Sequence, residues 1–222
     1  MKNILILILF ASTISISCKK ENVGAGNDPT AQINAYPKEP LSADETASLL
    51  MMREEEKLAH DVYMALGNKW GTNIYSNIAS SEQSHTNAVL TLIQKYNLTD
   101  PVGSNPAGVF RDSTLQTLYN QLVAKGSLTA LDGFKIGATI EDLDIYDLNN
   151  WSSKTDNQDI RFVYQNLTKG SRNHLRSFYS QITGSGGSYT AQYLTQSELE
   201  AIINSPKETG SWEEILGFRA PF

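Results

Sequence analysis

SNIASSEQSHTNAVLTLIQKY, residues 76–96, combines a helical apolar stripe with two ionisable groups that lie inside it. At 100° per residue, the apolar side chains of this region fall on one helical face: Ile74, Ile78, Val89, Leu92 and Tyr96. Glu82 and His85 stand three residues apart within that face, where they would be buried. Because a buried carboxylate costs several kcal/mol unless a partner compensates its charge, the pattern predicts a helix with a polar site on its core side.

Further amphipathic helices are predicted on both sides of this stretch, and no segment shows the alternation typical of a strand. The long helices are expected at about residues 43–67, 72–96, 128–149 and 156–182. Shorter helices are expected at about 113–125 and 196–204. Four long amphipathic helices predict an all-α fold, a four-helix bundle with short extra helices.

The other three long helices also carry polar residues on their predicted core faces. Glu55 and Glu56 flank the centre of the first face, and Glu141 lies on the third with Asp144 at its edge. His174 lies within the stripe of the last long helix. Inward-facing carboxylates and imidazoles from four helices are the construction of bundle di-iron and di-manganese centres. A hydrogen-bonded network without metal is the alternative for each of these groups.

The acidic run REEEK, residues 53–57, is expected to be mostly a solvated helix face with one or two inward exceptions. Arg53 falls off the apolar face, and Glu54 and Lys57 are expected to point away from it. Tyr63 and Tyr164 are expected either to pack in the core or to hydrogen-bond to the polar site.

The N-terminus reads as a secretion signal: MKNILILILFASTISIS, a lysine followed by an apolar run and small residues. The next residue, Cys18, is the only cysteine, and SISCKKEN resembles a bacterial lipobox with Ser15 where leucine is usual. The resemblance implies cleavage before Cys18, lipidation of its thiol and a lipid-anchored protein of the bacterial envelope, on the periplasmic face or outer membrane. A plain secretory signal with a chance cysteine is the alternative. The expected division is signal 1–17, flexible tether 18–40, helical bundle 41–184 and C-terminal extension 185–222. Trp212 and Phe218, in the last stretch of the extension, are expected to pack onto the body of the protein.

The composition excludes several classes of function. The 222 residues are 40% hydrophobic and 19% charged, which is typical of a globular protein. The net charge is −6 and no basic stripe appears, so nucleic acid is not an expected partner. The chain shows no glycine-rich phosphate loop, nucleophile elbow or calcium-loop spacing.

Several segments resemble known helical motifs. EKLAHDVY, residues 56–63, resembles the Glu-x-x-Ala-x-x-x-Tyr signature in the first helix of rubrerythrins and other ferritin-like proteins. EQSH matches the Glu-x-x-His of their second helix, while GATIEDLDIYDL and NLTKGSRNHLRSF resemble the third and fourth segments. Together with MREEEKLAHDVY and NIASSEQSH, these motifs resemble the ferritin-like family known as DUF2202, over about residues 42–183.

The resemblance implies a set of metal ligands. Glu56 takes the first-helix position, Glu82 the bridging carboxylate, and His85, Glu141 and His174 complete the set. One position departs from the pattern: Ser171 stands where the fourth helix of ferritin-like proteins carries a glutamate. Asp144 is expected to lean inward and compensate; otherwise the site holds one metal, or two asymmetrically.

The expected function is therefore binding of iron, as a di-iron or mononuclear site, with manganese or zinc as alternatives. Oxidation of ferrous iron or reduction of peroxide is the expected chemistry, which would make the protein an oxidoreductase. The alternative is a non-catalytic, lipid-anchored binding or scaffold module with a structural metal or none. The metal ion and the membrane are the expected partners, and self-association into a homo-oligomer stays open.

Overall fold

The computed structural model describes residues 28–210 and 212. This part of the chain contains seven α-helices and no strand, which confirms the all-α prediction. They are α1 (Thr30–Ala35), α2 (Ala43–Trp70), α3 (Asn73–Lys95), α4 (Ser113–Gly126), α5 (Ala130–Ser152), α6 (Gln158–Gly184) and α7 (Gln196–Ile203). Within the described residues no helix is long and apolar enough to span a bilayer. The predicted signal, Cys18 and Phe218 lie outside the described residues.

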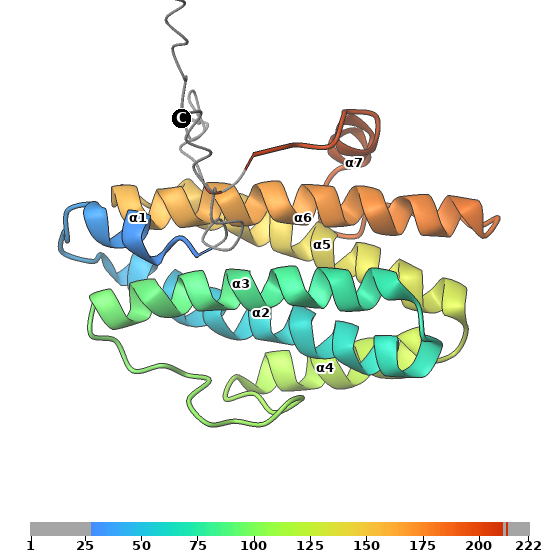
Figure 1. Cartoon of the computed structure of the whole chain (residues 1–222), viewed down its shortest axis with the longest axis horizontal. Coiled ribbons are helices and arrows are strands. Elements are labelled where there is room, and N and C mark those ends of the chain that lie inside the picture. The colour runs from blue at the N-terminus through green and yellow to red at the C-terminus, as the bar shows by residue number, and fades with distance from the viewer. Residues whose placement is uncertain (1–27, 211, 213–222) are drawn as a thin grey trace, which may run out of the picture.

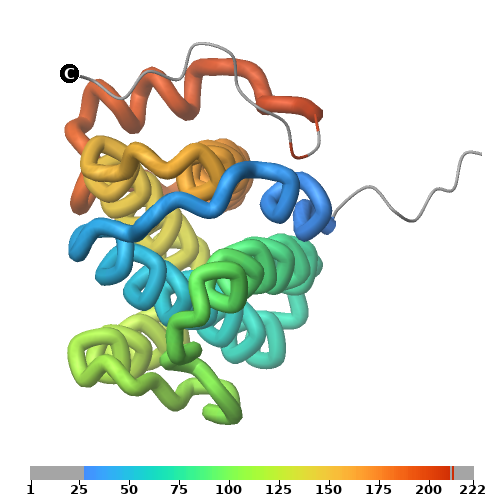
Figure 2. The backbone as a smooth tube through the Cα atoms, turned by 90° about the vertical axis from the view of Figure 1, so that its left-hand side faces the viewer, coloured from blue at the N-terminus to red at the C-terminus, as the bar shows by residue number. Residues whose placement is uncertain are grey.

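The four long helices lie side by side around a common centre (Figure 1 and Figure 2). Helix α2 packs closely against α3, and α5 packs closely against α6. The two pairs meet through α2 with α5 and α3 with α6. Helix α4 covers α2 and α5 on one outer side, while α7 lies beyond α6 on the opposite side (Figure 2).

A capping box starts α2. The Ser42 side chain accepts the backbone N–H of Glu45 at 3.1 Å, and the Glu45 carboxylate accepts the Ser42 N–H at 2.8 Å. The helix runs past Gly67, where its end was expected, and stops at Gly71, whose φ of 65° is the left-handed conformation that glycine favours. Gly67 remains helical because it packs against Tyr75, where a larger side chain would be crowded.

Helix α1 lies within the segment expected to be a tether. Its Ile33 is fully buried in an apolar cluster, and α1 contacts α3 and α6. Lys95 donates hydrogen bonds to the carbonyl oxygens of Ile33 and Tyr36, both at 2.9 Å. A six-residue helix that buries one isoleucine is too short to produce a periodic signal, so composition alone did not reveal it.

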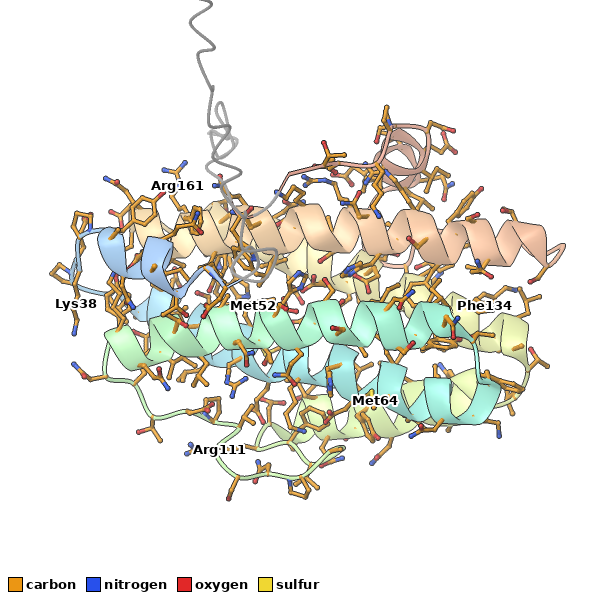
Figure 3. The ribbon with its side chains drawn as sticks, in the orientation of Figure 1. Lys38, Met52, Met64, Arg111, Phe134 and Arg161 are labelled. Atoms are coloured by element: carbon orange, nitrogen blue, oxygen red, sulfur yellow. The ribbon has the colours of Figure 1, made fainter. Side chains whose placement is uncertain are left out.

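The expectation of a solvated REEEK face is wrong: each of residues 53–57 is at most 8% exposed. The loop 97–112 lies over this side of α2 (Figure 3, where Arg111 marks it). Glu54 accepts backbone N–H groups of that loop, Arg53 pairs with Asp100 at 3.0 Å, and Lys57 donates to one of the loop's carbonyl oxygens. The charged run is thus the attachment site of a long loop.

The hydrophobic core is divided into two clusters along the helix axes. One cluster contains Met52 and the other Phe134, which lie toward opposite ends of the helices (Figure 3). On α2, α3 and α6 the predicted polar residues lie between the stretches that feed the two clusters, and on α5 they lie next to Ile145 and Leu148, which belong to different clusters. A polar layer therefore lies between the two clusters. Buried polar groups of this kind destabilise the fold unless they find partners within the layer.

Candidate metal centre

The polar layer brings together five of the six predicted ligands, from all four long helices. Each of the five residues is at most 9% exposed: Glu56, Glu82, His85, Glu141 and His174. They form two groups, Glu56–Glu82–His85 and Glu82–Glu141–His174, and within each group the ligand atoms lie within 4.8 Å of one another. Glu82 is common to both groups.

Glu82 lies between the two imidazoles. Its Oε2 is 2.8 Å from His85 Nδ1, and its Oε1 is 2.8 Å from His174 Nδ1. The two rings stack with their centroids 5.7 Å apart and an interplanar angle of 27°. Each end of the carboxylate thus faces a different imidazole, an arrangement in which one carboxylate can bridge two ions.

A second carboxylate accompanies each imidazole. Glu56 Oε2 is 3.2 Å from His85 Nδ1, and Glu141 Oε2 is 3.4 Å from His174 Nδ1. The layer therefore has a nearly symmetric form, with one imidazole and one outer carboxylate on each side of Glu82. Carboxylate and imidazole together are ligands that iron, manganese and zinc accept.

Several buried ligand atoms lack a hydrogen-bond partner among the described residues: Glu56 Oε1, Glu82 Oε1 and His174 Nδ1. The contacts of Glu82 and His174 are short enough for ion pairs but do not have hydrogen-bond geometry. Unpartnered buried atoms of this type are uncommon in folded proteins and call for a partner. A divalent cation fits them, because it needs lone pairs aimed at one point rather than donor–acceptor alignment.

Burial and the neighbouring charges shift the pKa values of the carboxyl groups and imidazoles in the layer. Burial raises the pKa of Glu56 to about 8. Burial acts in the same direction on Glu82, but the charges of His174 and His85 outweigh it and hold the pKa of Glu82 well below its usual range. Against the effect of burial, the neighbouring carboxylates raise the pKa of His85 well above its usual value and that of His174 to about 9. In the metal-free protein, protons on Glu56, His85 and His174 therefore reduce the net negative charge of the layer, as a bound metal ion would.

Tyr63 holds one of the outer carboxylates in place. Its hydroxyl donates to Glu141 Oε1 at 2.5 Å, and burial together with the Glu141 charge raises the pKa of the phenol well above its usual value. Tyr164 lies elsewhere, with its hydroxyl 2.7 Å from Ser48 Oγ. Of the two tyrosines considered from the sequence, Tyr63 alone contacts a predicted ligand.

Asp144 is the predicted ligand that falls in neither group. It is buried, its Oδ2 accepts a hydrogen bond from Ser171, and its Oδ1 has no partner among the described residues. Ser171 thus stands where a fourth-helix carboxylate was expected and binds an aspartate from α5 instead. The outer carboxylates of the two groups are Glu56 and Glu141, without a contribution from α6.

Two features of the site carry little signal in the sequence. Gly170 leaves room for His85: a Cβ at this position would lie 2.6 Å from both Cε1 and Nε2 of the ring. Asp147 lies close enough to the buried Glu55 for its charge to raise the pKa of that carboxyl, in the same direction as burial does. The spacing of three residues from Asp144 is the pattern that could have drawn attention to Asp147.

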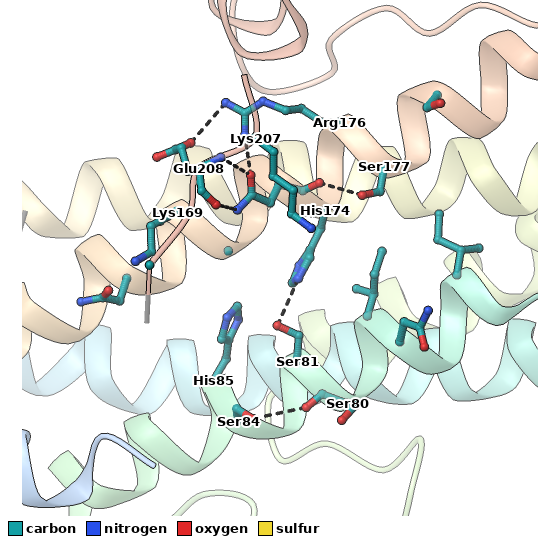
Figure 4. A pocket seen from close by; sticks show the side chains of 18 of the residues that line it. Ser80, Ser81, Ser84, His85, Lys169, His174, Arg176, Ser177, Lys207 and Glu208 are labelled. Carbon is teal, nitrogen blue, oxygen red and sulfur yellow. Dashed lines mark hydrogen bonds and ion pairs between the residues drawn. The ribbon is translucent and has the colours of Figure 1, made fainter. Parts of the chain in front are cut away.

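A cleft of about 1070 Å³ opens between α3 and α6 and reaches both histidines (Figure 4). Serines line much of it, and His174 Nε2 is 3.1 Å from Ser81 Oγ. The helices α3 and α6 make fewer contacts with each other than the close pairs do, which leaves space for the cleft. A small molecule could therefore approach the imidazoles from this side.

The segment after α7 lies along the cleft (Figure 4). The carboxylate of Glu208 accepts hydrogen bonds from Arg172 at 2.5 and 2.7 Å and from Arg176 at 3.2 Å, which attaches the segment to α6. Trp212 packs edge-on against His85, with ring centroids 6.4 Å apart, and also contacts Phe162. The prediction that Trp212 lies on the body is therefore confirmed.

Comparison with known proteins gives one consistent relationship. Residues 45–206 match the model of a family described as "Uncharacterized protein domain (DUF2202)". The chain is 52% identical over 178 residues to the uncharacterized protein MJ0754 of Methanocaldococcus jannaschii, covering 80% of this chain and 96% of that protein. The crystal structure of the hypothetical protein MJ0754 from Methanococcus jannaschii superposes with a TM-score of 0.76 at 53% identity, covering 78% of this chain and 98% of that one.

Proposed function

The chain belongs to the DUF2202 family, and we propose that it is a ferritin-like protein whose helices α2, α3, α5 and α6 form a four-helix bundle around two metal ions. Glu82 would bridge the ions, with Glu56 and His85 completing one site and Glu141 and His174 the other. The position of the Glu82 carboxylate between two imidazoles, 2.8 Å from each Nδ1, carries this proposal.

Iron is the metal we propose. The mixed carboxylate–imidazole set suits iron, manganese and zinc, and the buried layer with a cleft on one side suits a metal that reacts with a small molecule. A pair of redox-active ions supplies electrons to oxygen or peroxide. Reduction of one hydrogen peroxide to two water molecules breaks the O–O bond and takes up two electrons and two protons.

The protein's own residues would prepare this chemistry. Glu82 and the two imidazoles set the positions of the ligands, and the Tyr63 hydroxyl orients Glu141 and holds a proton beside it. The two apolar clusters on either side of the layer keep water from its ends, so that a small molecule would reach the layer through the serine-lined cleft. The leader sequence supports an envelope location with lipid at Cys18, where peroxide or ferrous iron would arrive from outside the cytoplasm.

A non-catalytic module is the second candidate. The ion pairs of Glu82 with both protonated histidines give the layer internal partners, and this observation favours a hydrogen-bonded network that needs no metal. The two candidates differ in metal content and in their response to peroxide.

Elemental analysis of protein purified with iron supplied tests the proposal. We expect about two equivalents of metal per chain in the unmutated protein, and loss of most of it in Glu82→Gln. Glu200→Gln, at an exposed position on α7, is the matched control and should keep the metal. Spectral changes of the ferrous protein on addition of peroxide would support redox function. A protein that holds no metal, or holds zinc and ignores peroxide, would favour the non-catalytic module.

A further inference from the structure

A row of carboxylates runs along α5 away from the proposed metal centre. Glu141, Asp144 and Asp147 follow one another at intervals of three residues, which corresponds to a rise of about 4.5 Å per step in an α-helix. Glu141 and Asp144 are buried, whereas Asp147 is partly exposed. The row therefore begins at the centre and ends at the surface.

Glu55 on α2 lies beside this row. Its side chain is 3% exposed, and neither carboxylate oxygen accepts a hydrogen bond from a described residue. Asp147 is close enough for its charge to act on Glu55, and Glu55 is close enough for its charge to act on Asp144. Glu55 thus connects the partly exposed Asp147 with the buried Asp144.

The charges that act most strongly on these groups are all negative. Those acting on Glu55 come from Asp147 and Glu56, and those acting on Asp144 come from Glu56, Glu55 and Glu141. Buried carboxylates without a compensating cation are costly, and removing them from water is tolerated only when a proton or metal ion neutralises them. Carboxylate oxygens without nitrogen or sulfur are the ligands that hard divalent cations prefer.

The opposite side of the molecule is less suited to cations. The cleft between α3 and α6 is lined by Lys169, Arg176 and Lys207, and Glu208, the one acidic residue among the described residues that line it, is bound by two arginines. A divalent cation would meet positive charge there, whereas a neutral molecule such as peroxide would not be repelled. Cations and the small co-substrate would then arrive from different sides.

We propose that Asp147, Glu55 and Asp144 form a carboxylate path that carries divalent cations from the surface beside α5 to the centre at Glu82. The inference rests on the proposed metal centre and adds a route by which it is filled. The outer end of the path lies at Asp147, close to Tyr193, whose ring contacts Tyr146 at a centroid distance of 6.4 Å. Within the path the ion passes Glu55 Oε1, Glu55 Oε2 and Asp144 Oδ1, which have no hydrogen-bond partner among the described residues, and it ends at ligands that include imidazole.

Loading kinetics test the path with Mn²⁺ as the probe, followed by the loss of the electron paramagnetic resonance signal of the free ion. Metal is removed from the full-length protein with a chelator. The wild type is then compared with Glu55→Gln, Asp147→Asn and the surface control Glu200→Gln. We expect the initial loading rate to fall about tenfold in Glu55→Gln and Asp147→Asn, since each replaces a carboxylate, which can release its proton and compensate the charge of the ion, with a neutral amide. The final Mn²⁺ content should stay that of the wild type.

The outcomes separate the path from the centre. If wild type takes up no Mn²⁺, the proposed centre fails and the path with it. If wild type fills but both path variants fill equally fast, the path alone is wrong. Variants that load at the normal rate to a lower final content would make Glu55 or Asp147 a ligand and would also overturn the path. Asp147→Asn lies at the partly exposed end and keeps the test decisive if the buried Glu55→Gln fails to fold.

Discussion

His85 and His174 stack across the boundary between α3 and α6, with ring centroids 5.7 Å apart and the Glu82 carboxylate in contact with both Nδ1 atoms. The two helices make few other contacts along this boundary, because the cleft occupies part of it. The polar layer therefore connects the helix pair α2–α3 with the pair α5–α6. Substitutions in this layer should alter both the metal content and the stability of the protein.

Gly170→Ala is expected to displace His85. A Cβ at residue 170 would lie 2.6 Å from the imidazole, a distance that forces the ring to move. We expect the metal content to fall toward one equivalent, since the same Cβ would lie 3.9 Å from His174 Cε1, an ordinary van der Waals contact that leaves this side in place. Elemental analysis measures this change.

Gly184→Ala is the matched control in the same helix. A Cβ at Gly184, the last residue of α6, meets nothing within 4 Å. Its metal content should equal that of the wild type. Equal metal content in Gly170→Ala would show that the position of the His85 ring does not matter for binding.

Tyr63→Phe is expected to destabilise the metal-free protein by about 1–3 kcal/mol, because Glu141 Oε1 loses its donor in a buried site. Phenylalanine keeps the ring and its packing against Tyr75 and Phe178. Urea unfolding of chelator-treated protein measures the free energy of unfolding. An unchanged value would mean that the hydroxyl does not hold Glu141.

The stability of the metal-free protein should fall as the pH rises from about 6.5 to about 9. His174 has its pKa raised from 6.5 to about 9, so its contribution is complete below 6.5 and is lost as the pH passes 9. Glu56, raised from 4.5 to about 8, acts in the same direction because its protonated form is favoured in the fold. The lowered pKa of Glu82 contributes above 4.5 and is lost only in strong acid.

Metal affinity should show the opposite trend over the same interval. Binding displaces protons from Glu56 and His174, so the affinity for Mn²⁺ should increase as the pH rises toward 9. Thermal unfolding of chelator-treated and Mn²⁺-loaded protein across this range measures both effects. A metal-free protein that becomes more stable between pH 6.5 and 9 would contradict the protonation described for the layer.

Helical periodicity was sufficient to predict the long helices, and the i, i+3 spacing of Glu82 and His85 was sufficient to place both on the core side. Boundaries moved by a few residues: α2 continues past Gly67 to Trp70, since a glycine that packs closely can remain in a helix. These properties depend on local sequence, which is why they could be predicted.

The environment of REEEK could not be predicted in this way. Its burial depends on the loop 97–112, which has no periodicity and returns to α2 from a distant part of the chain. Glu55 and Asp147 are neighbours only because α2 and α5 pack together. The room that Gly170 leaves for His85 likewise arises from the packing of α6 against α3.

Anomalous diffraction from crystals of the protein soaked in Mn²⁺ tests the central claim most directly, because it locates the ions without relying on activity. The proposed metal centre predicts two peaks in the polar layer, one on each side of the Glu82 carboxylate. The first peak should lie near Glu56 and His85, and the second near Glu141 and His174. A layer without peaks, or one with a single peak that leaves Glu82 bound to one ion, would contradict it.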